Sequence, residues 1–393
     1  MTKKFLWLTG YQWTCVLYIA VAIFSWQMKY FRHIDNNYLI FRQAYYHARA
    51  GLNLYAAYPN EYYDMYYYGP LFSLFVAPFA IPPEAVGLFL WEVANAVVII
   101  VAVNMLPLDD RRKKIMLLLC LLEFANSVFY MQFNPMITAM IIISFILVEQ
   151  GKDQWATLLI VLGAFVKLYP VVGLAFFVFS KDKPRFIIWT IAWFGIMMVL
   201  PMLISSPAYV INSYHQWFDA LNYKSGLNVQ LDTTQDWCLM GVVRRFSNNP
   251  MIPNLPFLIA GAIIFALPLT RFKQFNSLKF RLQILASALI MVVLFSTGSE
   301  HPTYIIAAAG AALYILIQDK PFTAINIAFI IALLITALTP TDVFPRPIRV
   351  WCGHYAVKAW PVIIIWFKLV YELIFKNFVE EKSQPGKLQI AAT

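Results

Sequence analysis

The chain repeats one pattern over most of its length, an apolar stretch followed by a short polar connection. An α-helix that crosses a bilayer needs about 20 apolar residues, and a shorter helix suffices where neighbouring helices shield it. The pattern therefore predicts an all-α integral membrane protein, a polytopic helical bundle of about 12 transmembrane helices. The predicted crossings are residues 5–28, 84–106, 115–131, 135–149, 155–168, 170–180, 186–204, 255–270, 282–298, 303–318, 322–339 and 358–375.

The segment 155–180 admits two interpretations. As one crossing it would turn the later basic loops outward, whereas a hairpin broken at Pro170 keeps every basic cluster on one side of the membrane. Cytoplasmic loops carry an excess of Lys and Arg, so this bias favours the hairpin, with both termini in the cytoplasm. The basic clusters are Lys3-Lys4, Arg111 to Lys114, Lys181 to Arg185 and Arg271 to Arg281.

This topology leaves three outer segments, at about 29–83, 205–254 and 340–357. The first contains an apolar piece, residues 71–81, that is too short to span and is expected to lie at the interface or to re-enter the membrane. Residues 1–376 are then one transmembrane domain, followed by a short cytoplasmic tail, 377–393. We expect a multi-pass protein of the cell (inner) membrane.

Composition agrees with this reading and excludes other classes. Hydrophobic residues make up 61% of the 393 residues and charged residues only 13%, about half of the usual charged fraction of a soluble domain. The abundance of large apolar residues also excludes a disordered chain. The net charge of +10 falls in loop clusters that set topology, so we expect no nucleic-acid partner.

The four cysteines show no metal-binding spacing, and we expect no metal and no cofactor. Cys238 and Cys352 both fall in predicted outer loops, where a disulfide could form or two free thiols could remain.

The first outer loop carries the most informative polar residues. Asp35 follows the first helix directly, where a carboxylate could act as a general base toward a hydroxyl. The alternative is that Asp35 caps a helix from about Asn37 to Ala50. Seven tyrosines between Tyr55 and Tyr68 follow, and they fit either an interfacial aromatic belt or a surface that stacks on sugar rings.

Ionisable residues inside apolar stretches favour function, because burying them in a membrane is costly. Glu92, Glu123 and Lys167 qualify. The two glutamates could equally serve structural ion pairs. Lys167 stands beside the break at Pro170, where an ammonium could reach an anionic phosphate or simply extend to the interface.

Two predicted helices begin with proline near their first position, at Asn134-Pro135 and His301-Pro302. The free N–H groups and positive dipole end of such a helix suit a phosphate. Glu300-His301 adds a titratable donor there, although an interfacial histidine is also a common structural residue. Arg244-Arg245 lie in an outer loop against the positive-inside bias, which favours a phosphate or lipid-headgroup role over a solvated turn.

Taken in order, these elements resemble the polyprenol-phosphate-mannose-dependent mannosyltransferases of glycosyltransferase family 87, which have the GT-C membrane fold. The resemblance covers most of the chain, although the residue before Gln132 is Met131 rather than a small glycine, and His301 is followed by Pro-Thr-Tyr304 rather than directly by an aromatic residue. The matching elements are Asp35, Gly51-Leu-Asn-Leu-Tyr55, Tyr68-Gly-Pro70, Ala77-Pro78, Gln132-Phe-Asn134, Lys167-Leu-Tyr169-Pro170 and the serine-rich turn from Ser296 to His301.

The resemblance implies transfer of mannose or a related hexose, with inversion, from a polyprenyl-phosphate sugar to a glycolipid or glycan hydroxyl on the extracytoplasmic face. It implies Asp35 as the catalytic base. We expect Lys167, His301 and Arg245 to bind the donor phosphate, and the following residues to contact substrate: Gln132, Asn134, Tyr68, Tyr169 and Glu300.

Two other classes compete with this interpretation. A transporter or flippase of a lipid-linked sugar would use the same basic residues, but it usually shows two related halves, which we do not find in the sequence. A structural scaffold would leave Asp35, Lys167 and His301 without a purpose.

Overall fold

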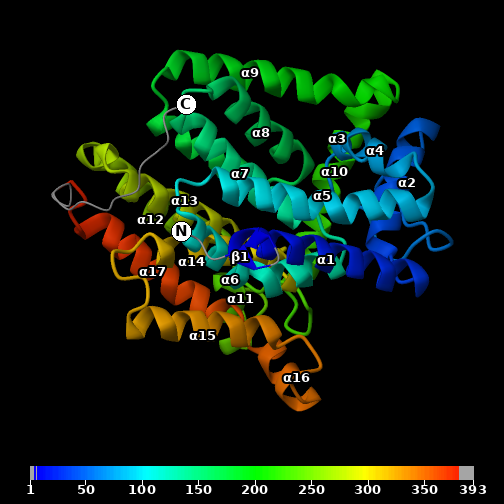
Figure 1. Cartoon of the computed structure of the whole chain (residues 1–393). Coiled ribbons are helices and arrows are strands. Elements are labelled where there is room, and N and C mark those ends of the chain that lie inside the picture. Colours follow the sequence, from blue (N-terminus) through cyan, green and yellow to red (C-terminus); the bar gives the residue numbers. More distant parts are fainter. Residues whose placement is uncertain (1–3, 6, 380–393) are drawn as a thin grey trace. The chain divides into compact units, whose positions relative to one another are not determined.

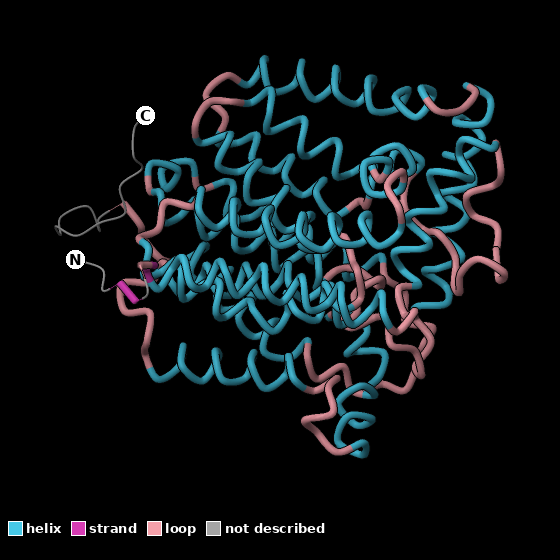
Figure 2. Tube along the Cα trace, turned by 45° about the vertical axis from the view of Figure 1, so that its right-hand side comes forward, coloured by secondary structure: helices cyan, strands magenta, loops and turns pink. Residues whose placement is uncertain are grey.

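The computed structural model describes residues 4, 5 and 7–379, so residues 380–393 of the predicted tail lie outside the described residues. The described chain is mainly helical, and two short strands, β1 (Lys4–Phe5) and β2 (Leu8–Thr9), pair antiparallel before the first helix (Figure 2). The helical class predicted from the apolar pattern is therefore confirmed.

The chain divides into two compact units. The first unit comprises Met1–Cys15, Val103–Asn126 and Gly226–Thr393, and the second comprises Val16–Ala102 and Ser127–Ser225. Each unit is built from stretches that are separate in the sequence. The single domain predicted for residues 1–376 stays a prediction.

Within the second unit, α8 packs between α7 and α9, and the three helices lie side by side (Figure 1). The short helix α3 contacts both α2 and α8. The helices that lie wholly or mostly in this unit are α1 (Gly10–Phe31), α2 (Asn36–Ala50), α3 (Pro70–Phe75), α4 (Ala77–Ala80), α5 (Glu84–Met105), α7 (Asn134–Glu149), α8 (Asp153–Val166), η1 (Tyr169–Phe179), α9 (Lys183–Val199), η2 (Leu200–Leu203) and α10 (Pro207–Asn228).

Within the first unit, α13, α14 and α17 form the core, and every residue of α14 is buried. Helix α15 contacts α17 and crosses it at an angle (Figure 1). The helices of this unit are α6 (Asp110–Phe129, most of its length), α11 (Leu239–Phe246), α12 (Leu255–Ala266), η3 (Leu267–Thr270), η4 (Phe272–Asn276), α13 (Leu278–Leu294), η5 (His301–Thr303), α14 (Tyr304–Leu316), α15 (Ala324–Leu338), α16 (Arg346–His354) and α17 (Ala359–Phe375).

Each predicted crossing coincides with a helix, and 170–180 is the 3-10 helix η1. Three described helices are long and apolar enough to cross a membrane by length and composition: Gly10–Phe31, Glu84–Met105 and Lys183–Leu203. Other apolar helices are shorter, such as α7 with 16 residues, which at 1.5 Å per residue spans about 24 Å against about 30 Å of hydrocarbon. Membrane-spanning helices are thus supported, and twelve crossings stay a prediction.

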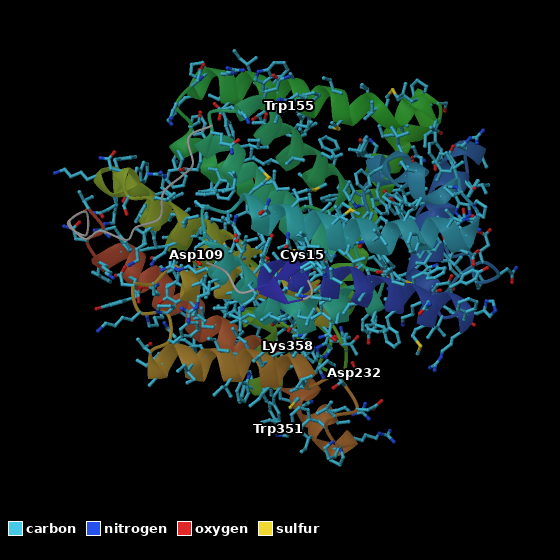
Figure 3. All side chains as sticks on the ribbon, viewed as in Figure 1. Cys15, Asp109, Trp155, Asp232, Trp351 and Lys358 are labelled. Atoms are coloured by element: carbon cyan, nitrogen blue, oxygen red, sulfur yellow. The ribbon has the colours of Figure 1, made fainter. Side chains whose placement is uncertain are left out.

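The predicted outer segments contain helices that hydropathy did not indicate. Residues 205–254 contain the 22-residue helix α10 and the short α11. Residues 340–357 contain α16, whose Trp351 is half exposed, whereas Lys358 just beyond it is buried (Figure 3). The apolar piece 71–81 forms α3 and α4, which agrees with its being too short to span.

The possible disulfide between Cys238 and Cys352 is not formed, because all four cysteines are free. Both thiols are buried. Cys238 instead begins α11, where its sulfur accepts a hydrogen bond from the Gly241 N–H at 3.4 Å and its thiol donates to Asp236 Oδ1 at 3.1 Å. The Cys238 thiol thus serves as the N-cap of α11.

Candidate functional site

Asp35 lies in the turn between α1 and α2 of the second unit and is buried, with 4% of its surface exposed. Its backbone carbonyl accepts from the Leu39 N–H at 3.1 Å, so Asp35 occupies the N-cap position of α2. The side chain makes no capping hydrogen bond, and Oδ2 has no hydrogen-bond partner among the described residues. Asp35 therefore occupies the capping position that was its alternative role, but its carboxylate does not cap the helix.

Burial raises the pKa of the Asp35 carboxyl above its ordinary value. Its own backbone N–H, His33 and Lys29 act in the opposite direction and are outweighed. A buried carboxylate with a raised pKa and an unpartnered oxygen is a stronger base than a solvated aspartate.

A second cluster in this unit surrounds Lys167, which follows α8. The Lys167 ammonium donates to Asn134 Oδ1 at 3.0 Å and lies over the rings of Tyr68 and Tyr169, 5.6 and 5.1 Å from their centroids. The Tyr68 hydroxyl donates to Gln132 Oε1 at 3.2 Å. All five residues were predicted from the sequence, and the structure brings them together.

Close backbone packing builds this cluster. The Gly69 N–H donates to the Val166 carbonyl at 3.0 Å, directly before Lys167. A Cβ at Gly69 would lie 1.9 Å from the Phe165 carbonyl oxygen, so only glycine permits this approach. The Gly69-Pro70 turn thereby holds Tyr68 against the end of α8, which explains why an aromatic residue and a lysine far apart in sequence meet.

The cluster has the electrostatics of an anion site. Asn134 is the first residue of α7, whose N-terminal N–H groups carry the positive end of the helix dipole. The Lys167 ammonium lies at the same helix end, and the two tyrosine rings cover its flanks. A phosphate there would meet two positive features, and the hydroxyl and amide groups nearby suit a sugar.

Asp35 is tied to the same segment of chain. The Asn37 side-chain amide donates to the Tyr130 carbonyl at 2.8 Å, two residues before Gln132. Met131 adopts a left-handed conformation with φ of 50°. That conformation is unstrained for glycine, which is a physical reason for the small residue that the resemblance led us to expect at this position.

The remaining predicted residues lie in the first unit. Glu300 accepts from the Gln235 side-chain amide at 2.6 Å, and the His301 ring lies 3.8 Å, between centroids, from that of Trp237. His301 Nδ1 and Trp237 Nε1 are buried without a hydrogen-bond partner among the described residues. Glu300 and His301 thus stand at the start of α14 with polar groups beside an indole.

Arg244 and Arg245 are buried rather than exposed to solvent. Arg244 makes a bidentate ion pair with Asp236, at 2.8 Å from Nε to Oδ2 and 2.7 Å from Nη2 to Oδ1. Arg245 donates to the carbonyls of Asp236, Thr233 and Gln235 at 2.9, 3.2 and 2.8 Å. Both arginines therefore organise the loop before α11, and Arg245 Nε has no partner among the described residues.

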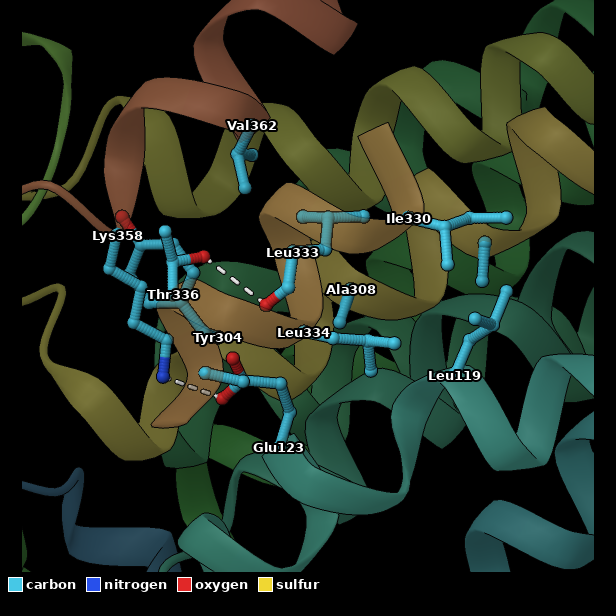
Figure 4. Close-up of a pocket in the computed structure, with 12 residues that line it drawn as sticks. Leu119, Glu123, Tyr304, Ala308, Ile330, Leu333, Leu334, Thr336, Lys358 and Val362 are labelled. Carbon is cyan, nitrogen blue, oxygen red and sulfur yellow. Dashed lines mark hydrogen bonds and ion pairs between the residues drawn. The ribbon is translucent and has the colours of Figure 1, made fainter. Parts of the chain in front are cut away.

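A buried ion pair lines a crevice in this unit. The Lys358 ammonium lies 2.7 Å from Glu123 Oε2, donates to the His301 carbonyl at 3.3 Å, and lies 5.0 Å from the Tyr304 ring centroid. Apolar residues of α15, such as Leu333, line the other wall (Figure 4). The crevice encloses about 20 Å³, which is room for about one water molecule.

Two neighbours of the predicted residues, Lys358 and Trp237, were not predicted from the sequence. Lys358 lies at the edge of an apolar stretch, where the sequence favours a lysine that extends to the membrane interface. In the structure its side chain is buried and pairs with Glu123. Among the described residues, no group of three or more His, Cys, Asp or Glu side chains is placed to hold a metal ion.

Residues 66–297, more than half of the chain, match the profile of glycosyltransferase family 87. The chain belongs to this family. The matched residues include the Lys167 cluster and Arg245, whereas Asp35, Glu300 and His301 lie outside them. No curated protein matches the chain.

Membership of family 87 makes the protein a glycosyltransferase, which acts on a sugar donor and an acceptor. Its apolar helices support a location in a lipid bilayer. The family does not favour the transporter interpretation.

Proposed function

We propose that this family 87 glycosyltransferase moves mannose or a related hexose from a polyprenyl-phosphate sugar to a hydroxyl of a glycolipid or glycan. In this proposal the fold is a GT-C-like bundle in the cell (inner) membrane. Both termini are cytoplasmic and the active site faces the extracytoplasmic side. The observation that carries the proposal is the buried Asp35 carboxylate, whose Oδ2 has no partner among the described residues.

In the proposed reaction Asp35 removes the proton from the acceptor hydroxyl. The acceptor oxygen attacks the anomeric carbon from the face opposite the phosphate and forms the new glycosidic bond. The bond from the anomeric carbon to the phosphate oxygen breaks, and polyprenyl phosphate leaves with the electron pair. The configuration at the anomeric carbon is inverted.

The Lys167 cluster is the proposed site of the donor phosphate. Charge on the leaving phosphate grows in the transition state, and a fixed ammonium beside a helix N-terminus stabilises it. Tyr68, Tyr169, Gln132 and Asn134 would contact the sugar or phosphate, since they surround this ammonium.

The proposal gives residues of the first unit supporting roles. Binding of the donor phosphate by His301 and Arg245 stays a prediction from the sequence, and each retains a ring or guanidinium nitrogen without a partner among the described residues. Glu300 would contact substrate beside them. The loop carbonyls already bound by Arg245 give that residue a structural function as well.

The test is Asp35→Asn in purified protein, assayed with a radiolabelled polyprenyl-phosphate hexose and a glycolipid acceptor in vesicles. Loss of a general base lowers the rate by about 10²–10⁴-fold. Asp219→Asn is the matched control, because Asp219 is an exposed aspartate of α10 in the same unit. Transfer by Asp35→Asn at the wild-type rate would show that the base assignment is wrong.

The same assay separates transfer from transport. A transferase produces a new glycolipid whose anomeric configuration is read by NMR, and the proposal expects it to be opposite to that of the donor. A flippase would expose the donor on the other leaflet and yield no glycosylated product. A product with retained configuration would refute the inverting mechanism.

A further inference from the structure

The seven tyrosines of the first predicted outer segment differ in exposure. Six of them are buried or partly buried: Tyr55, Tyr58, Tyr62, Tyr66, Tyr67 and Tyr68. Tyr63 is the exception, because 79% of its surface is exposed. Tyr63 alone among the seven therefore has most of its ring free to meet a ligand.

Asn36 holds the backbone of Tyr63 beside the proposed catalytic base. The Tyr63 N–H donates to Asn36 Oδ1 at 2.6 Å, and the Asn36 side-chain amide donates to the Tyr63 carbonyl at 2.9 Å. Asn36 is the first residue of α2 and follows Asp35 directly. Covalent bond lengths then keep the Tyr63 Cα within about 11 Å of the Asp35 Cα. A short glycan spans that distance.

The loop that carries Tyr63 is also fastened on both sides of it. The Glu61 carboxylate lies 2.9 Å from Nε2 of His47, in the last turn of α2. On the other side, the Trp217 indole of α10 donates to the Tyr67 carbonyl at 3.0 Å. The backbone of Tyr63 is therefore fixed while its ring stays exposed, so a ligand that binds there does not have to order the loop.

The side chains at this position have the chemistry of a sugar-binding surface. A tyrosine ring offers a large apolar face, on which the C–H face of a hexose can stack. The neighbouring Asp64 carboxylate is 57% exposed, and a carboxylate accepts hydrogen bonds from hydroxyl groups. In the proposed function the donor phosphate binds at Lys167, and Asp35 is the only residue of this unit assigned to the acceptor.

We propose that Tyr63 binds the acceptor sugar by stacking against it and thereby presents an acceptor hydroxyl to Asp35. This inference rests on the proposed function, because it assumes that Asp35 is the base that activates the acceptor. Tyr63 is then a specificity-determining residue, and Asn36 positions it. The aromatic ring is required for this role, whereas the phenol hydroxyl is not.

The experiment measures transfer by the full chain in vesicles, with octyl mannoside as the acceptor and a radiolabelled polyprenyl-phosphate hexose as the donor. Tyr63→Ala should raise KM for octyl mannoside by about three- to tenfold, the range expected for one aromatic contact. KM for the donor should stay the same. Tyr63→Phe should keep the wild-type acceptor KM, because it retains the ring. Tyr371→Ala is the matched control, since Tyr371 is an exposed tyrosine of α17, and it should match the wild type.

Asn36→Ala tests how the ring is placed. This substitution removes both hydrogen bonds to the Tyr63 backbone and keeps a residue that favours the helix. It should raise the acceptor KM in the presence of the Tyr63 ring and have little further effect in Tyr63→Ala, because both changes act on one contact. Additive effects of the two substitutions would contradict the proposal.

Asp35→Asn separates failure of this inference from failure of the proposed function. If Asp35→Asn is inactive while Tyr63→Ala keeps the wild-type acceptor KM, only the role of Tyr63 is wrong, and its ring belongs to the interfacial aromatic belt. An equal rise in the KM values of donor and acceptor would also overturn the inference, because it indicates a general structural effect. Transfer by Asp35→Asn at the wild-type rate would remove the base assignment itself.

A measurement without turnover gives a second test. Tetranitromethane nitrates exposed tyrosines, and mass spectrometry of the intact chain after digestion reports the extent of nitration at each position. Octyl mannoside should slow nitration of Tyr63 and leave that of Tyr371 unchanged, whereas polyprenyl phosphate should protect neither. Nitration of Tyr63 at the same rate with and without octyl mannoside would overturn the proposal.

Discussion

Loss of the ion pair between Asp236 and Arg244 should lower the stability of the protein substantially. Both side chains are fully buried. Arg244 donates to both carboxylate oxygens and also, at 2.9 and 2.8 Å, to the Ile252 carbonyl and Asn254 Oδ1. Substitution of Arg244 by Met keeps an apolar stem of similar length and removes all of these donors.

The expected cost follows from burial. Removing one partner of a buried ion pair leaves an uncompensated charge and costs about 3–5 kcal/mol. The Cys238 thiol and Arg245, whose Nη1 lies 3.8 Å from Asp236 Oδ2, only partly compensate. At roughly 2 °C per kcal/mol for a unit of this size, Tm should fall by about 6 °C or more.

Removing the Arg244 side chain should also disturb the predicted site residues Glu300 and His301. The Asp236 N–H donates to the Thr297 carbonyl and the Trp237 N–H donates to the Ser299 carbonyl, both at 2.9 Å. These two carbonyls lie just before Glu300 and His301 in the chain. A loosened Asp236 would release this turn. We therefore expect Arg244→Met to lower transferase activity at temperatures well below its own Tm.

The assay is thermal unfolding of detergent-purified protein followed by intrinsic tryptophan fluorescence. Arg349→Met is the control, because Arg349 pairs at 2.6 Å with Asp342, which is 94% exposed, and such surface pairs contribute little. The double variant Asp236→Asn/Arg244→Met should recover part of the loss, since no charge is then left unpaired. A Tm for Arg244→Met no lower than that for Arg349→Met would refute this reasoning.

Three further predictions concern the site and the thiols. Lys167→Met should lower kcat/KM for the polyprenyl-phosphate donor by about tenfold or more, because a charge-assisted contact is lost. Lys167→Arg should retain part of the activity. Equal rates for wild type and Lys167→Met would contradict the phosphate role. Burial raises the pKa of Asp35 in the folded state. The folded protein therefore loses stability as pH rises from the pKa of the unfolded state, about 3.9, through the raised pKa of the folded state, so Asp35→Asn should increase Tm at neutral pH and lose this advantage in acid. A Tm difference between variant and wild type that is the same at every pH would argue against a buried charge. Burial and the neighbouring Asp236 carboxylate raise the pKa of the Cys238 thiol. Cys238 and Cys352 should therefore resist alkylation in folded protein and react fully, without reductant, after denaturation. A mass corresponding to a disulfide would be the contrary result.

Much of the secondary structure could be predicted from the sequence because apolar length is a local property. The stretches at 84–106 and 135–149 became α5 and α7 with nearly the same bounds. The exceptions lie in mixed stretches. Helix α10 combines polar and aromatic residues without an apolar run, so hydropathy did not indicate it, although it spans 22 residues.

In the candidate site, too, the residues could be predicted from the sequence but their contacts could not. Asn134-Pro135 and the break at Lys167 were visible in the sequence, but the approach of Tyr68 to Lys167 required Gly69 to pack against α8. For Arg245, a charge outside the membrane suggested a ligand, whereas the structure shows three loop carbonyls around it. Nothing in the local sequence distinguishes those two uses.

The sequence by itself determined the membrane class, the positions of the apolar helices and the short list of polar residues with a possible role. Only the tertiary structure decided which of those residues are paired. Glu123 and Lys358 are 235 positions apart, and Glu92 meets α1 across 67 positions. The physical reason is that a buried charge is stable only beside a compensating group, and that group is supplied by helix packing over long distances in the chain, which no local pattern encodes.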